Sequence, residues 1–229
     1  MSSELDICKT ALSLIGDPAN ISSISPPDSS VQAQQCATFY PIARDSLLSF
    51  DWNFNTRRDT MPTAALPANV TEWLQAYTLP AGCLKLLAIL DPNAGDDISA
   101  PVLTPLSTPS TSPPWYSVDP MLVNYQPQPF VVETAVDGTP IVYTNQQNAF
   151  GRFTIRVTDT SKFSPLFVET CAWQLAGYLA GPIIKGEEGI KAAQACFAKA
   201  KEMRGEAKAA DAASSKKIIQ SNPSWIAGR

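Results

Sequence analysis

The sequence predicts an α+β fold that is mainly α: a four-helix bundle made from an N-terminal and a C-terminal helix pair, with a β-rich, Pro-rich insertion between them and an extended C-terminal tail. Apolar residues recur at helical spacing before residue 50 and again after residue 160. Short β-prone runs bounded by turn residues occupy the region between these two stretches. Prolines crowd residues 101–129 too densely for a helix or a central strand.

These patterns divide the chain into parts. We expect residues 1–50 and 160–213 to form the helical bundle and residues 51–159 to form the β-rich insertion, with a long Pro-rich loop over 101–129. Residues 214–229 are expected to form the tail. The chain has 229 residues, of which 45% are hydrophobic, and this is enough to bury a core in one elaborated domain or in two small ones.

The first two helices are predicted from caps and apolar spacing. Ser3 is a good N-cap for a first helix that stops at Gly16 and Pro18. Asp28 can cap a second helix that ends near Phe50, and we expect the two helices to form an antiparallel pair. Pro41 lies inside the second helix, where a proline costs about 3 kcal/mol, so a kink or local break is expected there.

The middle of the chain contains seven β-prone pieces. Asp137-Gly138 is the clearest hairpin turn between two of them. The prolines of residues 101–129 predict a long loop, which is either a plain surface loop or an arm that touches a neighbouring subunit. The expected strands are residues 52–58, 73–79, 84–90, 122–125, 131–135, 141–144 and 152–158.

Two further helices follow. Ser164-Pro165 combines an N-cap with proline at the first helical position, and the third helix runs to about Ile184. It is apolar almost all round, so we expect it to be the most buried helix. A stripe of small and polar residues on it indicates close helix packing: Thr170, Gln174, Gly177 and Gly181. The fourth helix, over residues 187–213, is rich in alanine and charge and has a narrow apolar stripe.

The tail carries several large apolar side chains beyond the last helical pattern. A frayed terminus is one interpretation, and docking onto a partner surface is the other. The residues concerned are Ile218, Ile219, Trp225 and Ile226.

Composition excludes several function classes. The net charge is −4 and the pI is about 4.9, which argues against a protein that coats nucleic acid by charge. The chain has no histidine, so the commonest general base and zinc ligand are missing. No glycine loop has phosphate-binding spacing. We therefore expect no enzyme activity, no cofactor and no metal. We also expect neither a membrane span nor a signal peptide.

Cysteines and paired arginines complete the residue-level picture. The five cysteines lie far apart without a C-x-x-C pair, which is typical of reduced core thiols in a cytosolic protein. Arg57 and Arg58 follow an aromatic segment and can bind phosphate or pair with acids across a subunit boundary. They can equally be two rim arginines at an exposed strand end.

Spaced motifs along the chain resemble those of a known family, the head-to-tail adaptors of short-tailed bacteriophages, also called tail tubular protein A or gatekeeper proteins. The resemblance spans most of the chain but leaves the Pro-rich loop without a counterpart. The motifs are Gly16-Asp17, Ala43-Arg44-Asp45, Trp52-Asn53-Phe54, Arg57-Arg58, Tyr77-Thr78-Leu79-Pro80, Cys83-Leu84-Lys85 and the run of residues 163–169 that opens the second helix pair.

This resemblance implies a structural virion protein, made in the host cytoplasm and located at the head-tail junction. About a dozen copies would form a ring that docks under the portal protein and receives the tail nozzle protein. Genomic DNA would pass through the lumen without sequence-specific binding. The four apolar tail residues then become candidates for portal docking. Trp52, Phe54, Arg57 and Arg58 become candidates for inter-subunit or tail-facing contacts.

Two alternatives stay open. Some adaptors of this kind have been assigned a muramidase function, and a peptidoglycan-cleaving site needs only two carboxylates, for which the chain offers 21 acidic residues. No particular residue is assigned to that activity. The other alternative is a helical scaffold protein unrelated to phages.

Overall fold

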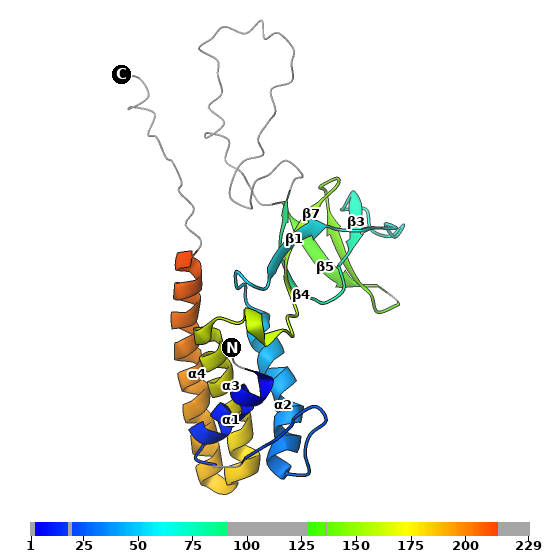
Figure 1. Cartoon of the computed structure of the whole chain (residues 1–229). Coiled ribbons are helices and arrows are strands. Elements are labelled where there is room, and N and C mark those ends of the chain that lie inside the picture. Colours follow the sequence, from blue (N-terminus) through cyan, green and yellow to red (C-terminus); the bar gives the residue numbers. More distant parts are fainter. Residues whose placement is uncertain (1–2, 18–19, 91–127, 136, 215–229) are drawn as a thin grey trace, which may run out of the picture. The chain divides into compact units, whose positions relative to one another are not determined.

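The computed structural model describes residues 3–17, 20–90, 128–135 and 137–214 (Figure 1). Within these residues the chain is an α+β protein with four helices and seven strands in two antiparallel sheets, and 47% of it is helical. It divides into two compact units. Among the described residues, the helical unit comprises positions 3–17, 20–47, 52–54 and 158–214, and the β unit comprises positions 48–51, 55–90, 128–135 and 137–157.

The predicted fold class is therefore wrong. A mainly helical four-helix bundle with an insertion is not found, because the middle of the chain builds two sheets around its own core and the helices do not pack as two equivalent pairs. The predicted loop over 101–129 and the strand over 122–125 lie outside the described residues, apart from positions 128 and 129.

Each half of the helical unit begins as the sequence predicts. Helix α1 (Glu4–Leu14) starts with a capping box in which Ser3 and Asp6 bond each other's backbone N–H groups. It ends at Gly16, whose φ of +79° suits glycine. Helix α2 (Val31–Leu48) runs without a break through Pro41, so the local break expected there does not occur.

The last two helices form a hairpin. Helix α3 (Pro165–Ile184) starts after Ser164, whose side chain accepts a hydrogen bond from the N–H of Phe167. Helix α4 (Gly186–Ser214) follows after a tight turn at Lys185 and Gly186, which both have positive φ. A short 3-10 helix, η2 (Thr160–Lys162), precedes α3.

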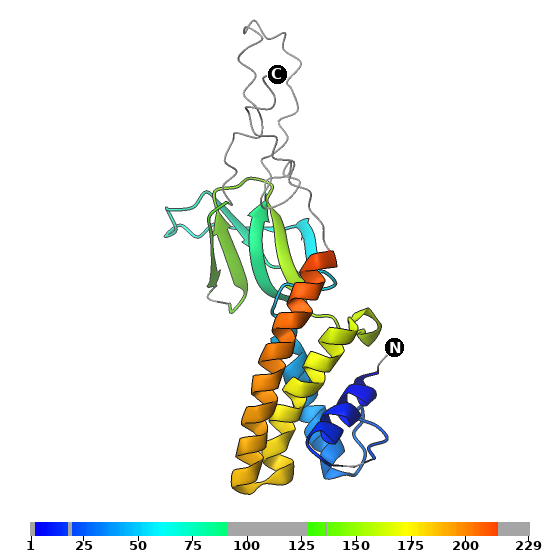
Figure 2. The same ribbon diagram turned by 90° about the vertical axis from the view of Figure 1, so that its left-hand side faces the viewer.

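Helix α3 is the centre of the helical unit. It packs most extensively against α4 and next against α1, and Figure 2 shows α3 and α4 running side by side. A Cβ atom on Gly177 would lie 2.7 Å from the ring of Phe197 on α4, so the small residue is what permits this close approach. Contacts between α1 and α2 are made by side chains, including Glu4 with Arg44.

The β unit contains two antiparallel sheets. The three-stranded sheet has the order β1-β7-β4, and the four-stranded sheet has the order β2-β3-β6-β5. Six strands overlap predicted runs, with ends that differ by up to four residues, whereas β2, a strand of two residues, has no counterpart among them. The bounds are β1 (Thr56–Thr60), β2 (Thr63–Ala64), β3 (Gln75–Thr78), β4 (Cys83–Leu90), β5 (Phe130–Thr134), β6 (Pro140–Thr144) and β7 (Phe150–Ile155).

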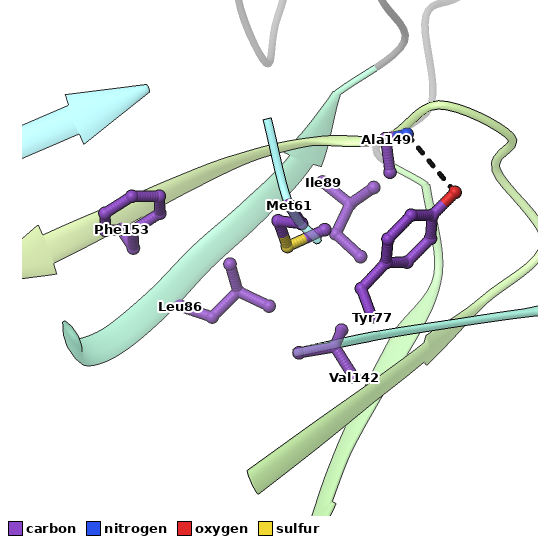
Figure 3. Close-up of a cluster of buried hydrophobic side chains, with 7 residues drawn as sticks. All are labelled: Met61, Tyr77, Leu86, Ile89, Val142, Ala149 and Phe153. Carbon is purple, nitrogen blue, oxygen red and sulfur yellow. Dashed lines mark hydrogen bonds between the residues drawn. The ribbon is translucent and has the colours of Figure 1, made fainter. Parts of the chain in front are cut away.

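The two sheets share one apolar core (Figure 3). The four-stranded sheet contributes Tyr77 and Val142, and the three-stranded sheet contributes Leu86, Ile89 and Phe153. The hydroxyl of Tyr77 donates to the carbonyl of residue 146 and accepts from the N–H of residue 149, which satisfies its polar end inside the core. The β unit thus buries its own hydrophobic surface.

The β5–β6 hairpin turns at Asp137-Gly138 as predicted. Gly138 has a φ of +83°, which glycine adopts without strain. The side chain of Asp137 accepts hydrogen bonds from the N–H and the hydroxyl of Thr139, and this turn fixes the register in which Val131 faces Tyr143 across the two strands.

Candidate functional site

The segment that links α2 to β1 holds the aromatic motif singled out from the sequence. Trp52 is fully buried and its ring Nε1–H donates to the carbonyl of Leu47 at 2.8 Å. Its ring lies edge-on to that of Phe167, with 5.2 Å between the ring centroids, and Phe54 packs against Phe163 and Phe167. Such aromatic pairs add to the burial energy of the individual rings. The motif is therefore part of the core of the helical unit.

Asn53 connects this motif to the end of the longest helix. Its backbone N–H donates to the carboxylate of Asp211 at 2.8 Å, and its side-chain amide donates to the carbonyl of Asp211 and to the hydroxyl of Ser214. The last carbonyls of a helix lack intrahelical donors. Asn53 supplies one of these donors and fixes the last turn of α4.

Arg57 and Arg58 lie on β1, which is an edge strand of its sheet, and both side chains are exposed. Arg58 lies directly opposite Arg152 of β7, so two like charges face each other across the strands. Lys85 on β4 is exposed as well. Successive side chains of a strand point to opposite faces, so Arg58 lies on the face of Arg152, whereas Arg57 lies on the face of Phe153.

The residues predicted to make contacts differ in their exposure to solvent. Trp52 has no exposed surface, so its side chain is not available to a partner in this structure. Phe54 is half-buried within the same aromatic cluster. Arg57 and Arg58 are exposed. The predicted portal-docking residues Ile218, Ile219, Trp225 and Ile226 lie outside the described residues.

An open hollow of about 430 Å³ lies on the four-stranded sheet. It is on the face that points away from the shared core, where Ala76, Ile141 and Tyr143 form a second apolar cluster with partly buried neighbours. The hollow is bounded by the loop after β2 and by the β5–β6 hairpin. Its lining residues are Pro67, Asn69, Val70, Glu133, Thr134, Ala135, Asp137 and Tyr143.

The polar groups of this hollow are mostly hydrogen-bond acceptors. Tyr143 is only 5% exposed, yet its hydroxyl makes no hydrogen bond within the described residues. Glu133 is exposed, and its carboxylate has no ion-pair partner in the same part of the chain. Asp137 uses one carboxylate oxygen for Thr139, and these bonds hold its pKa below the usual range. The hollow is thus an anionic, partly apolar site.

A second buried polar group lies inside the helical unit. The hydroxyl of Tyr40 is buried without a hydrogen-bond partner in the described residues, and burial raises its pKa. Nearby, Cys171 is fully buried and its pKa is raised to about 12 by desolvation. The hydrogen bond between Cys8 and Cys36, together with burial, raises the pKa of the Cys8 thiol.

The cysteines confirm one prediction from the sequence. All five are free thiols; four are buried and Cys83 is partly exposed. The pKa values of four thiols are raised, which keeps these thiols protonated at neutral pH: Cys8, Cys83, Cys171 and Cys196. The hydrogen bond with Cys8 lowers the pKa of Cys36. Packing rather than chemistry accounts for them.

No known protein family matches the chain, and no curated protein does. Within the described residues, no helix combines the length and apolarity needed to cross a membrane. The same residues contain no group of three or more cysteine and carboxylate side chains arranged to hold a metal ion.

Two features of the structure were not anticipated from the sequence. The Asn53–Asp211 contact joins residues far apart in the chain, and no local pattern indicates it. The hollow combines residues 67–70 with residues 133–143. The only local signal there was the Asp137-Gly138 turn, which predicted the hairpin but not the loop that closes over the sheet.

Proposed function

We propose that this protein is a head-to-tail adaptor of a short-tailed bacteriophage, a structural virion protein that forms a ring under the portal and joins it to the tail nozzle. The observation that carries the proposal is the order of the family-like motifs. Gly16 ends α1, Trp52-Asn53-Phe54 follows α2, Leu79-Pro80 follows β3 and Ser164-Pro165 starts α3. The motifs that resemble the family coincide with boundaries of helices and strands.

A ring of identical subunits is supported by the unlike surfaces of the β unit. A closed head-to-tail ring needs two different, complementary patches on each subunit. The three-stranded sheet carries exposed Arg57, Arg58 and Lys85, whereas the four-stranded sheet carries the anionic hollow. The exposed basic side chains of the first sheet and the carboxylates of the hollow have opposite charge.

Passage of DNA through such a ring is compatible with the composition. Strong basic stripes along a channel would hold the phosphate backbone by charge. The net charge of −4 gives the chain no overall basic excess. A lumen formed by several copies would then let the duplex slide.

Assembly on a portal ring tests the proposal. The purified protein is mixed with a dodecameric portal ring, and the mass of the complex is measured by native mass spectrometry. We expect a discrete complex with about one copy per portal subunit, as ring closure on a symmetric partner requires. A mixture that contains only free portal and free protein contradicts the proposal.

Two further experiments accompany this test. Deletion of residues 215–229 removes the four apolar tail residues and is expected to abolish portal binding, whereas a tail of the same composition in scrambled order serves as the control. A turbidity assay on purified cell walls addresses the muramidase alternative. Clearance that is lost on replacing a pair of carboxylates would favour an enzyme over an adaptor.

A further inference from the structure

The anionic hollow on the four-stranded sheet has the chemistry of a receptor for a basic side chain. Val70 and Ala135 belong to the apolar cluster around Tyr143, so they offer a floor for an aliphatic stem. The carboxylates of Glu133 and Asp137 line the same hollow. Long basic side chains bind in this way, with the stem on apolar surface and the charged head at polar groups.

Tyr143 provides an independent indication of a ligand. A tyrosine that is 95% buried normally finds a hydrogen-bond partner for its hydroxyl. The hydroxyl of Tyr143 has no such partner in the described residues, and its oxygen is not fully enclosed by protein atoms. It is therefore open to the hollow, where it can accept a hydrogen bond from an incoming donor.

The acceptors in the hollow fit a guanidinium group. Glu133 offers two free oxygens, and Asp137 offers Oδ2, because its Oδ1 is used by Thr139. Arginine presents five N–H donors in a planar fork that matches carboxylates. A lysine ammonium has three donors and would satisfy fewer of these acceptors.

We propose that the hollow binds an arginine side chain from β1 of a neighbouring copy, and that Arg57 is the residue that enters it. Arg57 is exposed, and its side chain has no hydrogen bond or ion pair within the described residues. Its positive charge complements the two carboxylates. This inference rests on the proposed ring function.

The same chain does not supply the arginine to its own hollow. Arg57 lies on an edge strand of the three-stranded sheet, and the hollow lies on the outer face of the four-stranded sheet. The shared core lies between these sheets, and packed sheets are about 10 Å apart. A second copy arranged head to tail brings the two surfaces together.

The first experiment tests the hollow without any assembly. The full-length protein, labelled with ¹⁵N, is titrated with N-acetyl-arginine methylamide, and with the citrulline analogue as an uncharged control of nearly equal shape. We expect saturable shifts of the amide signals of Glu133, Asp137 and Tyr143 with the arginine probe only. Equal shifts with both probes would overturn the proposal.

Matched variants assign the binding to the named groups. The double variant Glu133→Gln with Asp137→Asn keeps the shape and the acceptor for Thr139 but removes both charges, and it should weaken arginine binding at least tenfold. Tyr143→Phe removes only the hydroxyl and should weaken it several-fold. Circular dichroism melts identify a variant that fails to fold. Arginine binding that is unchanged in the folded double variant rejects the site.

A charge exchange tests whether the occupant is a second copy. Arg57→Glu and Glu133→Arg each place like charges together at the neighbour contact, so each should reduce the number of copies that assemble on the portal ring. The variant that carries both changes restores opposite charges and should recover assembly. Failure of the double variant to recover, with single variants that are impaired, excludes Arg57 as the occupant.

The two experiments separate the inference from the proposed function. If the native protein does not bind the portal, the adaptor function fails, while the arginine titration still decides whether the hollow is a basic side-chain receptor. If the portal complex forms and the titration shows no arginine-specific shifts, only the inference fails.

Discussion

Trp52 and Arg57 lie close together in the sequence, yet one side chain is buried and the other is exposed. Trp52 is enclosed by aromatic rings and donates a hydrogen bond to the carbonyl of Leu47. Arg57 is exposed on an edge strand. The first residue stabilises the fold, whereas the second is available for binding. A stability measurement distinguishes these roles.

We predict that Trp52→Phe lowers the free energy of unfolding by about 2–4 kcal/mol, because it leaves a cavity and an unpaired buried carbonyl. Arg57→Ala should change it by no more than about 0.5 kcal/mol, as is usual for an exposed side chain. Urea unfolding followed by circular dichroism measures both values. An equal loss in the two variants would contradict the assignment.

The hydrogen-bonded carboxylate of Asp28 makes the folding stability of the protein depend on pH in the acid range. Its carboxylate accepts hydrogen bonds from Ser30 and Ser22, and these bonds hold its pKa far below the usual range. The ionised form is therefore favoured in the folded state. The pKa of an aspartate in the unfolded chain is about 3.9. The contribution of Asp28 to the free energy of unfolding is therefore complete above about pH 4, and it is lost as the pH falls towards the folded pKa.

We predict that Asp28→Asn lowers the melting temperature at pH 7, and that the difference from the native protein shrinks as the pH falls below about 4. Melting curves recorded from pH 7 to pH 2 measure this difference. Glu72→Gln, at an exposed carboxylate in the β unit, is the control. A difference that stays constant over the whole pH range would show that the hydrogen-bonded carboxylate is not its source.

At the scale of elements, the α3–α4 hairpin depends on small residues at particular turns of the helix. The stripe Thr170, Gln174, Gly177 and Gly181 indicated close packing, but its members are not equivalent. A Cβ on Gly177 would lie within 3 Å of the Phe197 ring, whereas a Cβ on Gly181 would meet nothing within 4 Å. Of the two glycines in this stripe, only Gly177 is required for the contact.

We predict that Gly177→Val destabilises the protein by about 2 kcal/mol or more through overpacking against Phe197. Gly181→Ala should stabilise it by about 0.5–1 kcal/mol, because alanine has the higher helix propensity and the site is open. Thermal and urea unfolding of both variants measure the two effects. A stabilising valine at position 177 would mean that the helices are less closely packed than described.

Elements were predictable where a local chemical signal marks their ends. Ser3, Ser164-Pro165 and Asp137-Gly138 act on neighbouring backbone groups, so the sequence alone predicts two helix starts and one hairpin. Strand β2 has only two residues and carries no pattern of its own. It is defined by pairing with β3, and pairing is not a local property.

The fold class and the hollow were missed for the same reason. Strand β7 pairs with β1 on one side and β4 on the other, although long stretches of chain separate them. No local periodicity specifies which strands meet. The hollow likewise needs Asn69 and Tyr143 on one face of a sheet. Arg57, the basic residue of the proposed contact, could be singled out because a pair of arginines after an aromatic segment is visible in the sequence.

At the scale of the whole molecule, each unit buries a hydrophobic core of its own. Leu175 is fully buried in the helical unit, and Ile89 is fully buried in the core between the two sheets. The helical unit is built from three separate chain segments, so its stability depends on contacts between distant parts of the sequence. Hydrogen exchange can follow the two cores separately.

We predict that Leu175→Ala and Ile89→Ala each cost about 2–5 kcal/mol, since each leaves a cavity in a packed core. Exchange should accelerate most in peptides of α3 and α4 for the first variant, and in peptides of β4 and β7 for the second. Leu74→Ala, at a side chain that is 69% exposed, is the control and should leave exchange unchanged. Equal acceleration in all peptides of both core variants would mean that the chain opens as one cooperative body, and the two cores would then not be separate sources of stability.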